Sequence, residues 1–327
     1  MGLRNRLFRW YFPETAAAAA IRRMPMSSGG VFMYHEVLPD SVTLPAWTIV
    51  RESDFRRQMN YLRMHFDVLS MDQALDRVSA KRPGGKPFAV VTFDDGYQGN
   101  LHTVLPIMES MELPFILYVA TRAVVDTIVY WYDRIINLLN IPEDVLVCLQ
   151  LNGQEECFRI PRRAKENIRW REIQRLLARL KQIEPHEREK ISRRIADKYA
   201  VIESPLGMLS PEDLRNIAGS NLATIGCHTH GHELLDQLEP QEIRDTINLA
   251  CEHITYITGA PPRHFAYPNG NFNELVIGQV REAGFETAVT TIHGFWSGGN
   301  SCLKIPRIAI GRFDTMGCFK ARASGYI

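Results

Sequence analysis

Short apolar runs that alternate with amphipathic segments constrain the fold of this chain more than any other feature of its sequence. Each run has the length and the β-branched or aromatic content of a buried strand. The expected strands are Val31–His35, Ala89–Phe93, Phe115–Ala120, Ala223–Cys227, His264–Pro268, Thr287–Thr291 and Ile305–Gly311. Helix-start residues between them are Ser53, Ser70, Ser210 and Glu239, and helix-stop glycines are Gly259 and Gly284. Strands separated by helices predict an α/β fold with a parallel sheet, open or closed into a barrel.

Composition narrows the class of protein. The 327 residues, 45% of them hydrophobic and 23% charged, suffice for one large core or two modest ones. The 38 Lys and Arg residues nearly balance the 37 Asp and Glu residues, and a formal charge of +1 argues against a dedicated nucleic-acid binder. No stretch of the sequence is long and apolar enough to span a bilayer.

The cysteines bear on the compartment in which the protein works. Six of them are scattered without a C-x-x-C pair, namely Cys148, Cys157, Cys227, Cys251, Cys302 and Cys318. We expect them to be reduced thiols, which favours a cytoplasmic protein.

Residues 1–30 form an N-terminal segment without the order of a secretory signal, because charges and aromatic residues precede a short apolar run. In this segment Arg4, Arg6 and Arg9 are interleaved with apolar and aromatic residues such as Trp10. The pattern fits an interfacial anchor, and equally a terminus that packs a few aromatic rings on the body. We therefore expect a cytoplasmic protein with peripheral contact at the inner face of the membrane.

Residues 130–204 depart from the alternation of strands and helices. From Arg159 to Lys198 the chain has 14 Lys or Arg residues against 6 Asp or Glu residues, a local net charge of +8, in a largely helical pattern. We expect a basic helical insertion within a barrel that spans residues 31–312, followed by a tail at residues 313–327. The basic face is either a solvated surface or a patch for an anionic partner such as a lipid phosphate or a nucleotide.

Two adjacent acids follow the expected strand Ala89–Phe93, in the segment T-F-D-D-G-Y. A turn is the ordinary explanation for Asp-Asp-Gly after a strand. However, successive side chains of a strand point to opposite faces, so Asp94 and Asp95 are not expected to share one environment. One acid can bind a cation while the other stays free for proton transfer, provided that further ligands exist elsewhere in the chain.

Histidines directly after the expected strand Ala223–Cys227 can supply those ligands. His228 and His232 stand four residues apart, a spacing that brings both imidazoles to one side of a helical turn. His230 is expected to point away from them. In a parallel α/β barrel the carboxyl ends of the strands meet at one mouth, where Asp95 would join the two histidines. Two imidazoles and one carboxylate suit zinc or another divalent transition metal.

Together, the T-F-D-D-G-Y segment and the H-T-H-G-H segment at residues 228–232 resemble the polysaccharide deacetylase family. Further matches within residues 31–311 are V-F-M-Y-H-E-V, S-D-F-R-R-Q-M-N-Y-L, Y-W-Y-D-R-I, F-A-Y-P-N-G and I-P-R-I. The resemblance implies a deformed (β/α) barrel of about seven parallel strands. It implies a divalent metal ion, with zinc favoured, on Asp95, His228 and His232. It also implies a circularly permuted subgroup found among exopolysaccharide and cell-surface glycan enzymes.

The same resemblance implies roles for individual residues. Asp94 is expected to act as the base, and His35 as the general acid that protonates the departing amine. A backbone N–H near Asn269, in the segment with Tyr267 and Pro268, is expected to bind the oxyanion.

Two positions depart from the family pattern. Ala266 stands where many relatives carry an arginine that orients the base, and Arg307 is our hypothesis for its replacement. An asparagine at position 269 stands where an aromatic residue is frequent in the family, so this position does not supply an aromatic ring on which a sugar could stack. The candidates to line a sugar-stacking surface, each equally plausible as a core residue, are Trp131, Trp296 and Tyr267.

The implied function is metal-dependent removal of N-acetyl groups from an N-acetylated sugar or glycan intermediate in cell-surface polysaccharide biosynthesis. One alternative is the same metal site acting on another amide, as in deformylation. A second is a non-catalytic carbohydrate-binding barrel, although a binder has no need of Asp94 and His35. A cytoplasmic location would suit a lipid-linked or nucleotide-linked substrate. The sequence indicates no nucleic-acid partner and carries no signal for the oligomeric state.

Overall fold

The computed structural model describes residues 12–80, 85–126, 128–151, 153–201 and 206–327 of the chain. The expected interfacial anchor around Arg4 and Trp10 lies outside the described residues. Among the helices within these ranges, none combines the length and the apolar character needed to cross a membrane.

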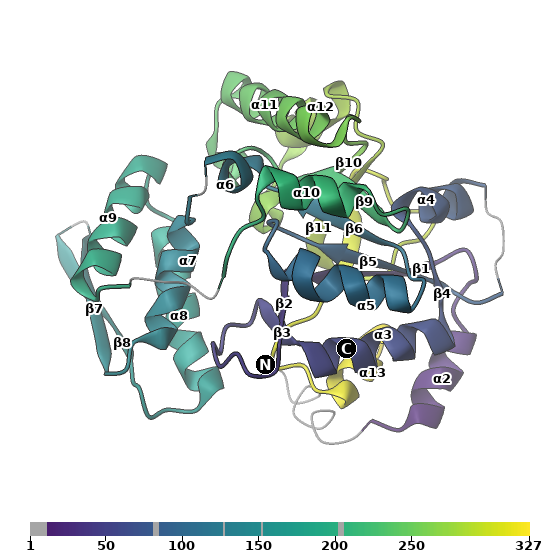
Figure 1. Ribbon diagram of the computed structural model, residues 1–327, viewed down its shortest axis with the longest axis horizontal. Helices are drawn as coiled ribbons and strands as arrows, with labels where there is room; N and C mark the ends of the chain where they lie inside the picture. The colour runs from purple at the N-terminus through teal and green to yellow at the C-terminus, as the bar shows by residue number, and fades with distance from the viewer. Residues whose placement is uncertain (1–11, 81–84, 127, 152, 202–205) are drawn as a thin grey trace.

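Seven parallel strands close into a barrel, with helices packed around it (Figure 1). In the order in which they pair, the strands are β1 (Gly29–Tyr34), β12 (Ile305–Ala309), β11 (Thr287–His293), β10 (His264–Ala266), β9 (Ala223–Cys227), β6 (Phe115–Val119) and β5 (Phe88–Phe93). The pairing of β1 with β5 closes the ring, and the short strand β4 (Asp67–Val68) adds to the start of β5. The predicted (β/α) barrel is therefore confirmed, with its strands at the positions expected from the sequence.

The barrel is irregular around β10. This strand is three residues long and pairs with β9 at Phe265 and Cys227. The pairing of β11 with β12 shifts its register between Val289 and His293. These irregularities account for the deformed shape that the resemblance implied.

Alternate residues of the barrel strands face two separate apolar layers. In β1 and β5, Val31 and Val90 belong to the layer inside the barrel, whereas Phe32 and Val91 face the surrounding helices. Successive side chains of a strand point to opposite faces, and here both faces are covered. This double burial explains why the strands appear in the sequence as continuous apolar runs.

Helices and short elements complete the outer layer. The helices are α2 (Glu14–Arg22), α3 (Glu52–His65), α4 (Met71–Ser79), α5 (Leu105–Ser110), α6 (Thr121–Asp126), α10 (Pro211–Ala218), α11 (Pro240–Thr258), α12 (Glu274–Glu282) and α13 (Met316–Ala323). The short elements are β2 (Glu36–Leu38), β3 (Ile49–Arg51), η1 (Asn100–Val104), η3 (Leu235–Gln237) and η4 (Pro268–Gly270).

Most of the helix ends predicted from the sequence are confirmed. Ser70, Ser210 and Glu239 cap α4, α10 and α11, each in a reciprocal pair of side-chain and backbone hydrogen bonds. Gly259 ends α11 in the left-handed conformation. The start predicted at Ser53 is wrong, because α3 begins one residue earlier and the Asp40 carboxylate accepts the hydrogen bond of the Ser53 N–H.

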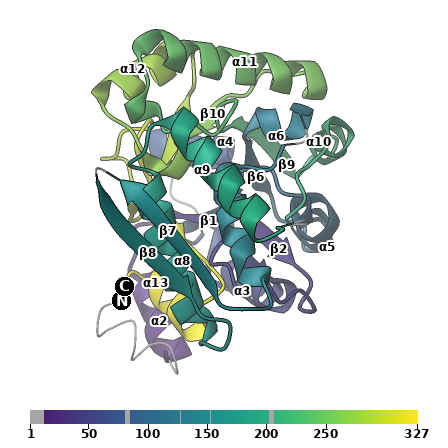
Figure 2. The same ribbon diagram turned by 90° about the vertical axis from the view of Figure 1, so that its left-hand side faces the viewer.

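The segment between α6 and α10 forms a separate unit beside the barrel, at the left of Figure 1 and facing the viewer in Figure 2. It contains α7 (Trp131–Ile136), η2 (Asn137–Asn140), β7 (Val145–Leu151), β8 (Gln154–Ile160), α8 (Glu166–Leu180) and α9 (Pro185–Lys198). Its apolar core includes Phe158 and Leu176 and continues to Ile49 beside the barrel. Besides its helices the unit contains the antiparallel hairpin of β7 and β8, which the helical pattern of the sequence does not predict.

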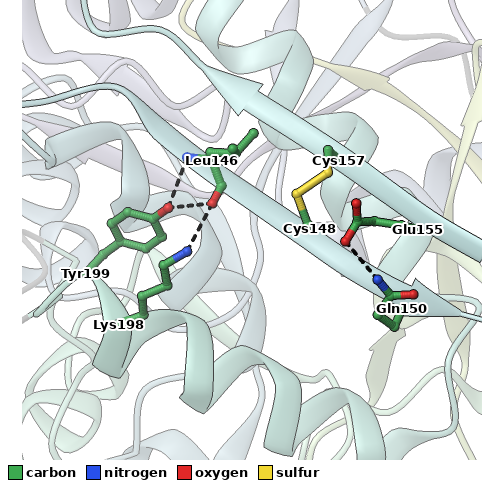
Figure 3. The surroundings of a disulfide bond; sticks show 7 residues. All are labelled: Leu146, Cys148, Gln150, Glu155, Cys157, Lys198 and Tyr199. Atoms are coloured by element: carbon green, nitrogen blue, oxygen red, sulfur yellow. Dashed lines mark hydrogen bonds between the residues drawn. A yellow bond between two sulfur atoms is a disulfide. The ribbon is translucent and has the colours of Figure 1, made fainter.

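The hairpin carries a disulfide between Cys148 and Cys157, which stand opposite each other in β7 and β8 (Figure 3). Their Cα atoms are 4.1 Å apart. Beside the disulfide, the Tyr199 hydroxyl accepts a hydrogen bond from the Leu146 N–H at 3.0 Å, which ties the end of α9 to β7. The expectation of six reduced thiols is wrong for this pair, because the strand register brings together two cysteines that are nine positions apart. The free cysteines are Cys227, Cys251, Cys302 and Cys318.

Candidate functional site

Asp95, His228 and His232 meet at the mouth formed by the carboxyl ends of the barrel strands. Asp95 follows β5, and the two histidines follow β9. The Asp95 Oδ1 atom lies 3.4 Å from Nε2 of His228 and 3.3 Å from Nε2 of His232. One ligand atom from each of the three residues can be chosen so that all lie within 4.8 Å of one another. The structure thus brings together the three residues that the sequence predicted as metal ligands.

The chemistry of this cluster fits a metal ion. The Asp95 Oδ1 atom is buried and has no hydrogen-bond partner among the described residues. The His228 Nδ1 lies 2.7 Å from the carbonyl oxygen of Ala266, which can only accept, so Nδ1 carries the proton and Nε2 is left as a ligand atom. One carboxylate and two imidazoles suit zinc or another divalent transition metal and leave positions for water and substrate.

The backbone of the cluster lies in the left-handed region at three non-glycine residues. The φ angles are 77° at Asp95, 64° at Thr229 and 56° at His232. The expected helical turn from His228 to His232 is therefore wrong, and an irregular loop places the two imidazole rings 4.9 Å apart. Because Asp95 leaves the strand conformation, it borders the same cavity as Asp94, which strand geometry alone would not allow. Strained residues of this kind persist where the surrounding structure fixes them, often at functional sites.

His230 points away from the cluster, as the sequence predicted. Its Nδ1 lies 2.9 Å from the Thr121 hydroxyl, and its ring stacks on His253 at 5.3 Å. These contacts tie the loop after β9 to α6 and α11.

Arg307, from β12, holds Asp94 with two hydrogen bonds. Its Nη1 donates to Oδ1 and its Nη2 to Oδ2, both at 2.8 Å. The guanidinium is itself fixed, because Nε donates to the Thr290 carbonyl at 2.8 Å and Nη1 also donates to the Thr92 hydroxyl at 3.3 Å. Both members of the ion pair are almost fully buried. The structure thus places beside Asp94 the arginine that we chose as its orienting partner.

Both acids are held as carboxylates. Burial raises the pKa of Asp95, but the imidazoles of His228 and His232 lower it more, so that it lies well below its ordinary value. Burial also raises the pKa of Asp94, but the charge and hydrogen bonds of Arg307, together with the neighbouring imidazoles of His228 and His35, lower it more. The anionic form is the one that binds a metal ion or accepts a proton.

His35 follows β1 and borders the same cavity as the two acids. Its Nδ1 atom is buried without a hydrogen-bond partner in the described part of the chain, and its ring lies edge-on to Trp47 at 5.9 Å. Burial lowers the pKa of His35 more than the neighbouring carboxylates of Asp95 and Asp94 raise it. The neutral imidazole is favoured at rest, so an acid role requires that His35 first takes up a proton.

A cavity of about 700 Å³ lies over these residues, between the barrel mouth and α8 of the insertion. Its aromatic lining includes Trp47, Tyr97, Tyr132 and Trp170, none of which was predicted from the sequence as a site residue. The available signal was the helical pattern around Trp170, in which Arg171 and Arg175 recur at helical spacing. That pattern does not reveal which part of the barrel the helix covers.

The segment expected to bind the oxyanion reaches the cavity at one residue. Asn269 borders it, in the left-handed conformation with a φ angle of 56°. Tyr267 does not line the cavity, because its ring packs on Phe272 and its hydroxyl donates to the Leu303 carbonyl at 3.0 Å. Pro268 is buried and likewise absent from the lining.

The candidates for a sugar-stacking surface separate clearly. Trp131 lines the cavity. Trp296 is fully buried inside the barrel against Phe88, with ring centres 5.8 Å apart, and Tyr267 is in the core. The hypothesis is therefore wrong for Trp296 and Tyr267, whose rings fill the barrel and its outer layer.

Comparison with known proteins identifies the family. Residues 81–288 match the sequence model of the family described as polysaccharide deacetylase. A search of curated proteins found no match to the chain. Among solved structures, the chain is similar to the Streptococcus pyogenes deacetylase PplD in complex with acetate. The identity is 14% and the TM-score 0.60, over 90% of this chain and 98% of that one.

Two further solved structures are similar in fold. IcaB from Ammonifex degensii is 16% identical, with a TM-score of 0.59, over 90% of this chain and 97% of that one. The BpsB deacetylase domain from Bordetella bronchiseptica is 15% identical, with a TM-score of 0.53, over 86% of this chain and 96% of that one. At these identities the likeness concerns the fold, while the family match covers most of the barrel and both motifs of the cluster. The chain belongs to the polysaccharide deacetylase family.

Proposed function

We propose that this chain is a metal-dependent hydrolase that removes N-acetyl groups from an N-acetylated sugar or glycan intermediate of surface polysaccharide biosynthesis. Membership of the polysaccharide deacetylase family supports deacetylation of a sugar. The finer proposal depends mainly on two neighbouring acids that border one cavity. Asp94 accepts two hydrogen bonds from Arg307, whereas Asp95 lies beside the imidazoles of His228 and His232. A carbohydrate-binding protein would have no need of a separate, oriented base. Membership of the circularly permuted subgroup stays a prediction.

The metal ligands in this proposal are Asp95, His228 and His232. A divalent ion bound there, with zinc favoured, would polarise the acetyl carbonyl and lower the pKa of a water molecule. The Ala266 carbonyl fixes the proton of His228 on Nδ1 and so keeps Nε2 directed at the cluster.

Protons move through Asp94 and His35 in this proposal. Asp94, oriented by Arg307, takes a proton from the attacking water. His35, which directly follows the adjacent strand β1, first takes up a proton and then donates it to the sugar nitrogen as the C–N bond breaks. A backbone N–H near Asn269 stabilises the negative charge on the acetyl oxygen, a contribution typically of about 10²–10³ in rate. The products are acetate and a free amine.

The test is acetate release by the purified protein. After chelation, the protein is reconstituted with zinc, manganese or cobalt and supplied with a panel of N-acetylhexosamine donors. We expect release that requires added metal and falls to background in Asp94→Asn. The exposed Asp245→Asn on α11 is the matched control and should leave the rate unchanged. Stoichiometric metal binding without acetate from any donor would contradict the proposal and favour another amide or a binding role.

A further inference from the structure

The cavity wall opposite the barrel is one face of α8. The lining residues from this face include Trp170, Arg171, Gln174, Arg175, Ala178 and, directly after the helix, Lys181. Their spacing of three and four positions places them on the same side of an α-helix. The insertion therefore presents cations to the cavity that holds the metal-ligand cluster.

These cations are not neutralised within the cavity. The carboxylates that line it are Asp94 and Asp95, and they are already bound to Arg307 and close to two imidazoles. In the ranges that the structure describes, neither Arg171 nor Lys181 forms an ion pair with a carboxylate. Arg175, by contrast, pairs with Glu172 at 2.6 Å. The wall thus carries unpaired positive charge toward the site.

Lys181 is the most constrained of these cations. It is half-buried, and its Nζ donates a hydrogen bond to the Asn269 side-chain oxygen, so it links the insertion to the loop proposed to bind the oxyanion. Burial lowers the pKa of the Lys181 ammonium, and the positive charge of Arg188 lowers it further. A half-buried cation without a counter-ion is costly, and an anionic ligand beside it would offset that cost.

Arg188 of α9 provides a second, independent observation. Its side chain is 6% exposed, and its Nε and Nη1 atoms are buried without a hydrogen-bond partner among the described residues. The guanidinium stacks on the ring of Trp131 at 4.9 Å, and that ring lines the main cavity. Arg188 itself lines a neighbouring cavity of about 370 Å³, which shares Trp131, His232 and Leu234 with the first. Unpaired donors on a buried guanidinium are the groups that a phosphate oxygen satisfies best.

We propose that Lys181, Arg171 and Arg188 form a subsite for a phosphate or diphosphate group, so that the substrate is an N-acetylated sugar esterified to phosphate. This inference rests on the proposed deacetylase function. A phosphate offers two charges and several acceptor oxygens to cations on two helices, whereas a sugar carboxylate offers one charge. The carrier beyond the phosphate is either a nucleoside or a lipid.

The experiment compares donors that differ in the carrier alone. They are the methyl glycoside, the 1-phosphate, a nucleoside diphosphate ester and a short-chain prenyl diphosphate ester of one N-acetylhexosamine. For the wild-type protein we expect kcat/KM to be at least roughly tenfold higher for a phosphorylated donor than for the methyl glycoside. The better of the two diphosphate esters identifies the carrier. Lys181→Gln and Arg171→Gln should each raise KM for the phosphorylated donor and reduce that preference several-fold or more.

Arg163→Gln is the matched control, because Arg163 is an exposed arginine of the same insertion outside both cavities. It removes the same charge and should keep the preference for phosphorylated donors. A preference that is equally lost in Arg163→Gln would mean that the general charge of the insertion, not the subsite, attracts the substrate, and would overturn the assignment.

Calorimetric binding of hexosamine 1-phosphate to the metal-loaded protein gives a readout that does not depend on turnover. We expect roughly tenfold weaker binding to Lys181→Gln and to Arg188→Gln than to the wild type. Equal acetate release from neutral and phosphorylated donors, with equal binding to the variants, would overturn the subsite while the deacetylase proposal stands. Binding that depends on Lys181 without acetate from any donor would support the subsite and contradict the deacetylase proposal.

Discussion

Arg307 and Asp94 join β12 to the end of β5 inside the barrel, through two hydrogen bonds of 2.8 Å. The two residues are 213 positions apart, and the guanidinium that orients Asp94 arises from a strand other than the one that carries Ala266. The geometry explains how a chain with alanine at position 266 can still hold a base in a fixed orientation.

Arg307→Gln should leave Asp94 buried without its counter-charge. Since Arg307 lowers the pKa of Asp94, its loss raises that pKa, and the acid limb of kcat/KM against pH should move to higher pH. The free energy of unfolding should fall by about 3–5 kcal/mol, as is typical when one partner of a buried ion pair is removed. Arg307→Lys keeps the charge but not the paired hydrogen bonds, so its pH profile and its free energy of unfolding should lie between those of the wild type and Arg307→Gln. An unchanged pH profile in Arg307→Gln would show that another group tunes Asp94.

Asp95→Asn should lose the metal ion. A neutral amide oxygen is a weaker ligand than a carboxylate. Loss of a residue that merely orients a metal ligand typically lowers metal affinity by roughly 10–100-fold, and loss of the ligand Asp95 should lower it by more. The measurement is the metal-to-protein ratio after dialysis against a metal buffer. Asp94→Asn is the paired control, because it should lose activity and keep the metal. Equal loss of metal in both variants would contradict the division of roles between the two acids.

His35→Gln should reduce kcat and leave the metal content unchanged. Removal of a general acid typically costs about 10²–10⁴ in rate. Because His35 is not one of the three residues in the metal-ligand cluster, a variant that has also lost its metal would show that the histidine belongs to the ligand set instead. Steady-state kinetics and metal analysis on the same preparation distinguish the two roles.

The sequence revealed the parts of the fold that follow from local periodicity and from compact motifs. The barrel strands were predictable because double burial makes each of them a continuous apolar run, as in Phe88–Phe93. The cluster of Asp95, His228 and His232 was predictable because its residues follow two such strands. Its local conformation was not, since positive φ angles at Asp95 and His232 depend on the surrounding structure.

The features that the sequence did not reveal depend on long-range placement. The ring of Tyr267 belongs to the same segment as Asn269, yet the irregular turn η4 sends the two side chains to different places. The position of α8 over the barrel mouth depends on packing between the insertion and the barrel. The Cys148–Cys157 pairing depends on the register of the hairpin of β7 and β8. The sequence signal for this hairpin is an Asn-Gly pair at positions 152–153, and it lies in a segment whose overall pattern predicts helices.

Glu36 makes the stability of the fold depend on pH. It is fully buried and accepts hydrogen bonds from the N–H groups of Val37 at 2.9 Å and Gly99 at 3.4 Å. Burial raises the pKa of Glu36 from 4.5 to about 8. A carboxyl with a higher pKa in the folded state stabilises the fold fully below the unfolded pKa, and that stabilisation is lost as pH rises toward 8.

Glu36→Gln, which cannot ionise, should therefore gain in Tm relative to the wild type as pH rises from 5 to 8. A change of 1 kcal/mol in the free energy of unfolding shifts Tm by about 2–4 °C in chains of roughly 150–250 residues. Thermal unfolding at several pH values measures the difference between the two proteins. Glu233→Gln, a half-buried acid elsewhere in the fold, is the control. A difference in Tm that does not change with pH would mean that Glu36 is ionised in the folded protein.

The Cys148–Cys157 disulfide bears on where the protein works, because both cysteines are exposed and open to cellular reductants. Cytoplasmic thiols are kept reduced, whereas an oxidising compartment preserves such a bond. The cytoplasmic location expected from the sequence therefore predicts that both cysteines are labelled when cells are quenched in acid and the denatured protein is then treated with maleimide at neutral pH. Protection of both until a reductant is added would contradict that location. Cys302→Ser, which removes a free cysteine, should not change the labelling of the pair.

In the purified oxidised protein, reduction of the Cys148–Cys157 disulfide should destabilise the insertion by about 2–3 kcal/mol, because the bond closes a short loop. Cys148→Ser should reproduce that loss, and a chain that unfolds identically with and without reductant would show that the bond does not constrain the hairpin.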